Sequence, residues 1–139
     1  MSNRMEVSVV IPVYNSADIL TELSSQINKV LSEYKHEIIL VDDGSTDNSW
    51  KIIEEISNNS KSLIGVHLSR NFGQDNAIMA GLNLSKGDYI VIMDDDLQHS
   101  PYDIKVLLKR IKKGYDVCYA NYSQHKRQSI LKNIGSGIN

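Results

Sequence analysis

The stretch Ile90–Pro101 reads Ile-Val-Ile-Met-Asp-Asp-Asp-Leu-Gln-His-Ser-Pro, an apolar run that ends abruptly in three carboxylates. The apolar run is typical of a buried strand, and Asp94–Asp96 then follow at the strand's carboxyl end. Three adjacent acids repel one another unless a cation lies among them, so the pattern favours a divalent metal that carries a phosphorylated ligand. The alternative is that these acids form an ordinary solvated loop.

The composition indicates a globular protein with a single domain. The chain has 139 residues, of which 41% are hydrophobic and 23% charged, so we expect one domain over residues 1–139. Its net charge of −2 argues against a nucleic-acid binder, which carries a basic excess. Cys118 is the only cysteine, which excludes an intrachain disulfide and a cysteine zinc cluster and fits a reducing compartment. The N-terminus is polar and the sequence has no long apolar window, so we expect neither a signal segment nor a membrane span.

Strand and helix patterns alternate along the chain. Strands are expected at Val7–Ile11 (ended by Pro12), Glu37–Val41, Leu63–Leu68, Tyr89–Met93 and Asp116–Ala120. Helices are expected from the N-cap Ser16 to Tyr34, over Trp50–Ile56, over Gln74–Leu84 and from Ser100 to Gly114. The alternation predicts right-handed crossovers and a mostly parallel sheet with helices on both faces. Small residues in the third helix predict that it packs close to the sheet.

Polar clusters follow four of the predicted strands. They are Pro12–Asn15, Asp42–Gly44, Arg70–Gly73 and Asp94–Asp96. Ligands of parallel α/β sheets bind at the carboxyl ends of the strands, so the four clusters predict one ligand site at that edge. Polar loops at strand ends are common without a ligand, and this alternative stays open.

The acid triplet can hold a hard metal ion. Side chains alternate along an extended segment, so Asp94 and Asp96 lie on one side and Asp95 points the other way. Mg²⁺ and Mn²⁺ prefer oxygen ligands, and Gln98 can add an amide oxygen. A nearby helix N-terminus can stabilise the same acids without a metal.

The second acidic pair divides into two roles. Asp43 is predicted to hydrogen-bond a base or ribose, whereas Asp42 is predicted to accept turn amides of Gly44–Asp47. The chain has no Gly-x-Gly-x-x-Gly and no P-loop, which argues against dinucleotide binding and P-loop chemistry. A receiver-like phosphoryl-transfer domain requires a lysine on a later strand, and Tyr115–Asn121 supplies none.

Four motifs in order carry a family resemblance. They are Val9–Asn15, Val41–Asp47, Arg70–Gln74 and Asp94–His99. They resemble family 2 glycosyltransferases, which have the Rossmann-like GT-A fold, and in particular polyprenyl-phosphate sugar transferases of the dolichyl-phosphate mannose synthase and bactoprenol glucosyltransferase kind. The resemblance covers roughly Val7–Asn121. It implies inverting transfer of a sugar from a nucleoside diphosphate sugar with Mg²⁺ or Mn²⁺ as cofactor.

The resemblance also implies roles for residues of the donor pocket. Pro12, Tyr14 and Asn15 match the lining of the nucleotide pocket, and Asp43 matches the residue that binds the base. The pair Arg70–Asn71 matches the loop beside the nucleotide.

The acid triplet matches the Asp-x-Asp motif of the family. Asp94 and Asp96 match its two catalytic acids, which bridge ribose, metal and diphosphate. Gln98 matches a further position on the metal side. Asp95 stands at the middle position beside the nucleotide, where the lipid-phosphate subgroup often has alanine.

The resemblance implies a polyprenyl phosphate as acceptor. A lipid phosphate is already anionic at neutral pH and requires no general base. A saccharide hydroxyl is the alternative acceptor and requires a carboxylate base, and a fragment that binds the nucleotide sugar without transfer is a further alternative. The region of Arg127 and Ser129, with Lys126 behind them, resembles the part of the lipid-phosphate subgroup that meets the acceptor phosphate. The alternative is an ordinary amphipathic helix with a solvated basic face.

The end of the chain, an isoleucine stripe and two single residues complete the expectations. GT-A domains of this family are usually much longer than 139 residues, so a domain truncated at its C-terminus is expected. The full-length protein is expected in the cytoplasm, at the cytoplasmic face of the membrane. Ile130, Ile134 and Ile138 have the spacing of a helical stripe. His67 is predicted to have no ligand partner, and Trp50 to pack a helix on the sheet.

Overall fold

The computed structural model describes residues 3–97, 100–121 and 130–133. The chain divides into two compact units, Met1–His99 and Ser100–Asn139, and each is described by itself. The expectation of a single domain over residues 1–139 stays a prediction.

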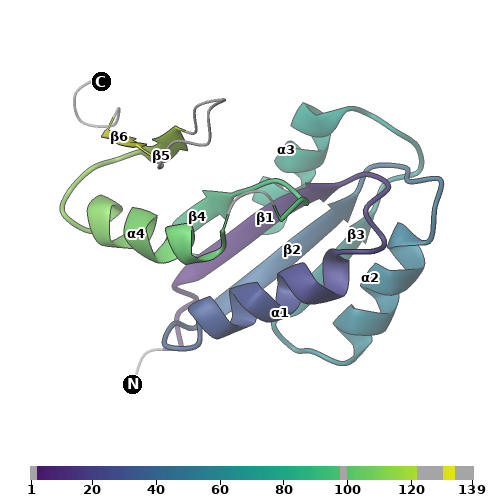
Figure 1. The fold of residues 1–139 in the computed structure, drawn as a ribbon, viewed down its shortest axis with the longest axis horizontal. Helices are drawn as coiled ribbons and strands as arrows, with labels where there is room; N and C mark the ends of the chain where they lie inside the picture. Colours follow the sequence, from purple (N-terminus) through teal and green to yellow (C-terminus); the bar gives the residue numbers. More distant parts are fainter. Residues whose placement is uncertain (1–2, 98–99, 122–129, 134–139) are drawn as a thin grey trace. The chain divides into compact units, whose positions relative to one another are not determined.

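The first unit is a parallel sheet with crossover helices. In chain order it contains β1 (Val7–Val13), α1 (Leu20–Val30), β2 (His36–Asp42), α2 (Ser49–Asn58), β3 (Leu63–His67), α3 (Gln74–Leu84) and β4 (Tyr89–Ile92). The strand order is β3-β2-β1-β4, and every neighbouring pair is parallel. Figure 1 shows α1 and α2 on one face of the sheet and α3 on the other. The predicted α/β architecture is therefore confirmed.

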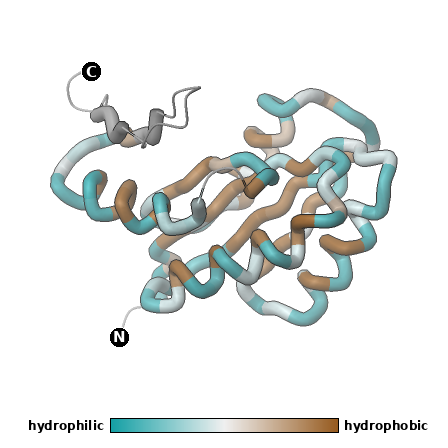
Figure 2. Tube along the Cα trace, in the orientation of Figure 1, coloured by the Kyte–Doolittle hydropathy of each residue, from teal (hydrophilic) through white to brown (hydrophobic). Residues whose placement is uncertain are grey.

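The two central strands form the core of this unit. All seven residues of β1 are buried, and so are the last six of β2. Figure 2 shows the corresponding hydrophobic bands along these strands. Strands covered by helices on both faces read as continuous apolar runs rather than alternating ones, which is why the sequence located them well.

Helix α3 lies close to the sheet because its inner face is small. Ala77 is fully buried against Val10 and Ile39. A Cβ on Gly81 would lie 2.5 Å from Val10 Cγ1, so only glycine permits this approach. The predicted close packing of the small-residue helix is confirmed.

Three predicted boundaries in the first unit are wrong, namely the end of β1 and both ends of α1, which ends at Val30 rather than Tyr34. Strand β1 continues through Pro12 to Val13, because β4 pairs only with Val7–Val10 and no ladder partner on that side requires an amide at Pro12. Helix α1 begins at Leu20 and has no side-chain cap. The Ser16 hydroxyl bonds elsewhere, donating to the carbonyl of Tyr14 and to the carboxylate of Asp95.

The opposite edge of the sheet carries a buried polar network that the sequence did not indicate. Ser8 is fully buried and Glu37 is 3% exposed. The Ser8 hydroxyl donates to Glu37 Oε2 (2.6 Å), which also accepts the amide of Lys86 (2.8 Å). The amide of Gly87 donates to Ser8 Oγ (2.8 Å). The network joins the starts of β1 and β2 to the turn before β4.

The second unit contains α4 (Tyr102–Ile111) and the antiparallel strands β5 (Cys118–Asn121) and β6 (Ile130–Asn133). Ser100 Oγ accepts the amide of Tyr102 (3.2 Å). The N-cap of α4 is nevertheless Pro101 rather than the predicted Ser100, and the helix has no side-chain cap hydrogen bond. The helical stripe predicted from Ile130 is wrong at that residue, because its backbone pairs with β5 instead. Ile134 and Ile138 lie outside the described residues. Within the described ranges, no helix has the length and apolar character of a membrane span.

Candidate functional site

The carboxyl ends of β1 and β2 are joined through Asn15. This residue has a φ of 52°, in the left-handed region that asparagine tolerates better than most residues. Its amide donates to Ser45 Oγ (2.9 Å), and its Oδ1 accepts the amides of Thr46 (2.8 Å) and Asp47 (3.3 Å). The side-chain oxygen is thus used to hold the loop after β2, and Asn15 acts on the site by shaping that loop.

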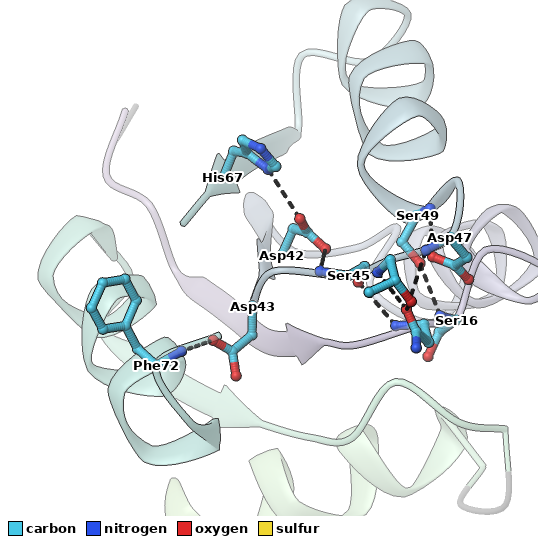
Figure 3. A network of polar contacts seen from close by, with 10 residues as sticks. Ser16, Asp42, Asp43, Ser45, Asp47, Ser49, His67 and Phe72 are labelled. Carbon is cyan, nitrogen blue, oxygen red and sulfur yellow. Dashed lines mark hydrogen bonds and ion pairs between the residues drawn. The ribbon is translucent and has the colours of Figure 1, made fainter. Parts of the chain in front are cut away.

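A second set of bonds fixes the same two loops. Asp47 accepts the amides of Ala17 (3.2 Å) and Ser49 (2.9 Å), and Ser49 Oγ accepts the amide of Ser16 (2.9 Å) (Figure 3). Burial raises the pKa of Asp47, but hydrogen bonds from Ser49, Ala17 and its own amide outweigh this and lower the pKa below 3.8. Asp47 therefore remains a carboxylate that organises amides, as an Asx turn does.

The two acids at the end of β2, Asp42 and Asp43, have different contacts. Asp42 is fully buried, and its Oδ1 accepts the amide of Ser45 (3.3 Å), which confirms its predicted turn-amide bonding. Asp43 is 4% exposed and points to the other side, where its Oδ1 accepts the amide of Phe72 (2.7 Å) (Figure 3). In the described part of the chain no protein donor to Asp43 Oδ2 is found, so this oxygen is available to a ligand.

The loop after β3 packs directly on the loop after β2. Gly44 has a φ of 72°, and a Cβ there would lie 2.6 Å from the carbonyl carbon of Arg70. The Arg70 guanidinium lies 4.0 Å from the centre of the Phe72 ring, a cation–π contact. Asn71 Oδ1 accepts the amide of Gly73 (3.0 Å) and so shapes the turn into α3. Arg70 and Asn71 thus pack against Gly44, the residue after Asp43, and their place beside a nucleotide stays a prediction.

The acid triplet after β4 makes contact with the loop after β1. Asp95 Oδ2 accepts the amide of Tyr14 (3.0 Å) and the hydroxyl of Ser16. The sequence placed Asp95 away from Asp94 and Asp96, but it gave no sign that this middle acid anchors the first loop. Asp94 is exposed, and its Oδ1 lies 3.4 Å from Gln74 Nε2 at the start of α3.

The remaining predicted site residues differ in burial, and three of them lie outside the described residues. Pro12 is buried within β1, whereas Tyr14 is 47% exposed at its end. Gln98, Arg127 and Ser129 lie outside the described residues.

The sequence did not indicate one contact at this edge. His67 has a polar partner: its Nδ1 lies 3.0 Å from Asp42 Oδ2, and its ring stacks on Trp50 with centroids 4.4 Å apart. The useful signal was register, because His67 is the direct neighbour of Asp42 across β2 and β3. Only the pairing of the strands reveals that relation.

The donor set after β4 suits a hard divalent ion. Asp94 and Asp96 offer carboxylate oxygens, and Asp94 is open to solvent. No group of three His, Cys, Asp or Glu side chains with metal-binding geometry occurs among residues 3–97, 100–121 and 130–133. Mg²⁺ commonly takes only one or two carboxylates and completes its shell with water and substrate phosphates, so this pair fits.

The fold and the candidate site define an α/β protein with a sheet of parallel strands, in which an acidic loop after β4 and the loops after β1, β2 and β3 follow the carboxyl ends of the strands. The chain belongs to glycosyl transferase family 2, because the model of that family matches residues 8–135. All four strand-end loops lie within the matched residues.

Relatives with assigned activities share this stretch of sequence. The chain is 46% identical over 115 residues to an undecaprenyl-phosphate 4-deoxy-4-formamido-L-arabinose transferase of Proteus mirabilis, covering 81% of this chain and 35% of the relative. It is 44% identical over 135 residues to the transferase of the same name from Yersinia enterocolitica, covering 94% and 41%. The chain therefore spans well under half the length of these relatives.

Solved structures of similar proteins confirm the GT-A-like fold. Mannosyltransferase PcManGT from Pyrobaculum calidifontis, in complex with GDP-Man and Mn²⁺, superposes with a TM-score of 0.60 at 27% identity, over 68% of this chain and 28% of that protein. S. aureus TarS in complex with UDP-GlcNAc superposes with a TM-score of 0.63 at 27% identity, over 78% and 32%.

Proposed function

We propose that this chain is the donor-binding part of a glycosyltransferase that transfers a sugar, with inversion, from a nucleoside diphosphate sugar to a polyprenyl phosphate. The observation that carries the proposal is the identity of 46% and 44% to two transferases named for undecaprenyl phosphate. The similarity to proteins solved with UDP-GlcNAc and GDP-Man supports a nucleoside diphosphate sugar as donor.

The nucleotide is proposed to bind where the loops after β1, β2 and β3 meet. Asp43 Oδ2 accepts a ring N–H of the base, while Oδ1 stays bound to the amide of Phe72. Tyr14 and Pro12 line the pocket from β1, and the pair Arg70–Asn71 lines it from β3. Asn15 acts through the Ser45–Asp47 turn that its side chain holds.

The diphosphate is proposed to lie at the end of β4. Asp94 and Asp96 would hold Mg²⁺ or Mn²⁺, with Gln98 as an auxiliary group. A divalent ion held by these residues would supply positive charge to balance the charge that builds up on a leaving diphosphate. Asp95 positions the nucleotide side of the site through Tyr14 and Ser16, since both donate to its carboxylate.

The acceptor phosphate supplies its own nucleophile. A phosphate monoester carries more than one negative charge at neutral pH, so its oxygen attacks without a general base. Arg127 and Ser129 are the proposed contacts of this phosphate. A lipid acceptor also implies that the full-length protein works at the cytoplasmic face of a membrane. A saccharide acceptor would instead require a carboxylate base.

Donor binding is tested by titrating the 139-residue chain with UDP and GDP, with and without Mn²⁺, and comparing wild type with Asp96→Ala. We expect one nucleotide to bind in a Mn²⁺-dependent way and the variant to lose that dependence. Asp88→Asn is the matched control, because Asp88 lies before β4 at the opposite edge, where it pairs with exposed Arg4. No binding of either nucleotide by folded wild type would refute the proposal.

Acceptor choice requires a transfer assay with a labelled nucleotide sugar. Transfer to undecaprenyl phosphate supports the lipid acceptor, and transfer to a saccharide alone supports the alternative acceptor. Binding without turnover on either acceptor would assign this chain donor binding only.

A further inference from the structure

His67 has no part in the proposed transfer, yet it is held on two sides. Its Nδ1 lies 3.0 Å from Asp42 Oδ2 (Figure 3), and its ring stacks on Trp50 at an interplanar angle of 26°. The Asp42 side chain is fully buried, whereas the His67 side chain is 48% exposed. The exposed residue of the pair thus supplies a polar group to the buried one.

The direction of this hydrogen bond follows from the chemistry of the pair. A carboxylate only accepts hydrogen bonds, so His67 must carry its proton on Nδ1 and donate it. Asp42 has one further donor among the described residues, the amide of Ser45 at 3.3 Å. A buried carboxylate that loses one of two donors is strongly destabilised and draws its surroundings into a new arrangement.

Asp42 is connected to the residues that we assign to the nucleotide. Asp43 follows it directly, and Ser45, which donates to Asp42 through its amide, accepts the amide of Asn15 through its hydroxyl. Gly44 packs against the backbone of the loop after β3 without space for a Cβ. A shift of Asp42 would therefore be transmitted to both Asp43 and Asn15.

We propose that His67 is a positioning residue of the donor-nucleotide site. Its Nδ1–H holds Asp42, Asp42 holds the turn Asp43–Ser45, and the turn presents Asp43 to the base. Trp50 keeps the imidazole in the orientation that this bond requires. This inference rests on the proposed function, because it assigns His67 a role in binding the same donor.

Two substitutions separate the hydrogen bond from the stacking. His67→Phe keeps an aromatic ring on Trp50 and removes the donor, whereas His67→Asn offers an amide N–H near the position of Nδ1 and removes the ring. We expect His67→Phe to raise the Kd for the nucleotide by roughly five- to tenfold and His67→Asn to stay within about twofold of wild type. Equal effects of the two substitutions, or an unchanged Kd in His67→Phe, would overturn the inference.

The probes are UDP and GDP, each with Mn²⁺, on the 139-residue chain. If wild type binds neither, the proposed function fails and the inference fails with it. If wild type binds and the two variants behave alike, the inference alone fails.

A spectroscopic measurement on wild type does not depend on the folding of any variant. Nitrogen-15 NMR of His67 in its neutral form should show a protonated Nδ1 and an unprotonated Nε2. The amide resonance of Ser45 should move in His67→Phe and stay near its wild-type position in His67→Asn, both without nucleotide. An Nε2-protonated tautomer in wild type would overturn the inference.

Discussion

Strand β2 has a buried acid near each end, and the two acids have different surroundings. Glu37 at its start receives two donors on one oxygen, the hydroxyl of Ser8 and the amide of Lys86. Asp43, just past its end, receives the amide of Phe72, whose side chain is exposed. Both residues are under 5% exposed, so burial alone does not distinguish them.

The difference lies in what surrounds each carboxylate. At the start of the strands the chain is close-packed, and a Cβ on Gly87 would lie 2.6 Å from the amide nitrogen of Ser8. No ligand group fits there, so Glu37 stabilises the fold. At the carboxyl ends the loops are exposed and Asp43 keeps an oxygen for a ligand. A buried carboxylate therefore stabilises the fold at one edge, and at the other edge it is proposed to bind a ligand.

The largest expected effect is a loss of stability when Glu37 is substituted. Glu37→Ala leaves the Ser8 hydroxyl and the Lys86 amide without their acceptor in a buried place, and we expect a loss of about 3 kcal/mol in the free energy of unfolding. Urea unfolding measures it, with exposed Glu54→Ala as the control, expected within about 0.5 kcal/mol of wild type. Nucleotide affinity of the folded fraction should not change. A loss below about 1 kcal/mol would contradict the structural role.

The next effect tests how tightly the loops after β2 and β3 are joined. Gly44→Ala combines an unfavourable positive φ with a collision against the backbone of Arg70, and we expect a loss of about 2 kcal/mol. Gly114→Ala is the matched control, because Gly114 has a φ of 110° and nothing within 4 Å of a Cβ. Its cost should be about 1 kcal/mol, from backbone strain alone. If urea unfolding shows equal losses of stability in the two variants, the backbone near Arg70 moves away from the new Cβ at little cost.

The third effect is on binding rather than stability. Asp43→Asn retains an oxygen for the amide of Phe72 but removes the charge that strengthens a bond to the base. We expect the Kd for the preferred nucleotide to rise about tenfold, equivalent to about 1.4 kcal/mol, while the midpoint of urea unfolding stays near wild type. Calorimetric titration measures the affinity. A fall in stability without a change in Kd would place Asp43 with Glu37 on the structural side of the comparison.

Much of the fold could be predicted from the sequence because its two central strands, β1 and β2, are buried almost throughout. Continuous apolar runs located β1 to β4, and small residues located α3 with its observed ends, Gln74 and Leu84. The boundaries that failed depended on partners in space. Pro12 stays in β1 because β4 ends early, and Ser16 caps no helix because Asp95 takes its hydroxyl.

The sequence predicted at which edge of the sheet the candidate site lies, but it predicted few of the contacts within the site. Strand ends and motifs placed Asp43 and Asp94 at one edge, since parallel strands bring their carboxyl ends together. Contacts across strands leave no local pattern, which is why the partners of His67 and Asp95 were missed. The Ser8–Glu37 bond spans 29 residues and was missed for the same reason.

The smallest expected effect concerns Asp47. This residue is an acid at the carboxyl edge of the sheet that stabilises the fold. Burial raises its pKa, but the hydrogen bonds from Ser49 and Ala17 prevail and lower it below 3.8. A lowered folded-state pKa means that the carboxylate stabilises the fold above about pH 3.8, and that this contribution is lost as the pH falls through the lower folded value. Because Asp47 is exposed and water screens it, the contribution should be under about 0.5 kcal/mol.

Asp47→Asn tests this acid through the pH dependence of urea unfolding. The variant should be slightly less stable than wild type at pH 7, and the difference should shrink as the pH falls below about 3.8. Exposed Glu54→Gln on α2 supplies the baseline for a substituted surface carboxylate. If Asp47→Asn changes the nucleotide Kd but not the pH dependence, Asp47 belongs with Asp43 as a ligand-binding acid. The expected result instead groups it with Glu37, because its oxygens are already engaged by amides of the chain.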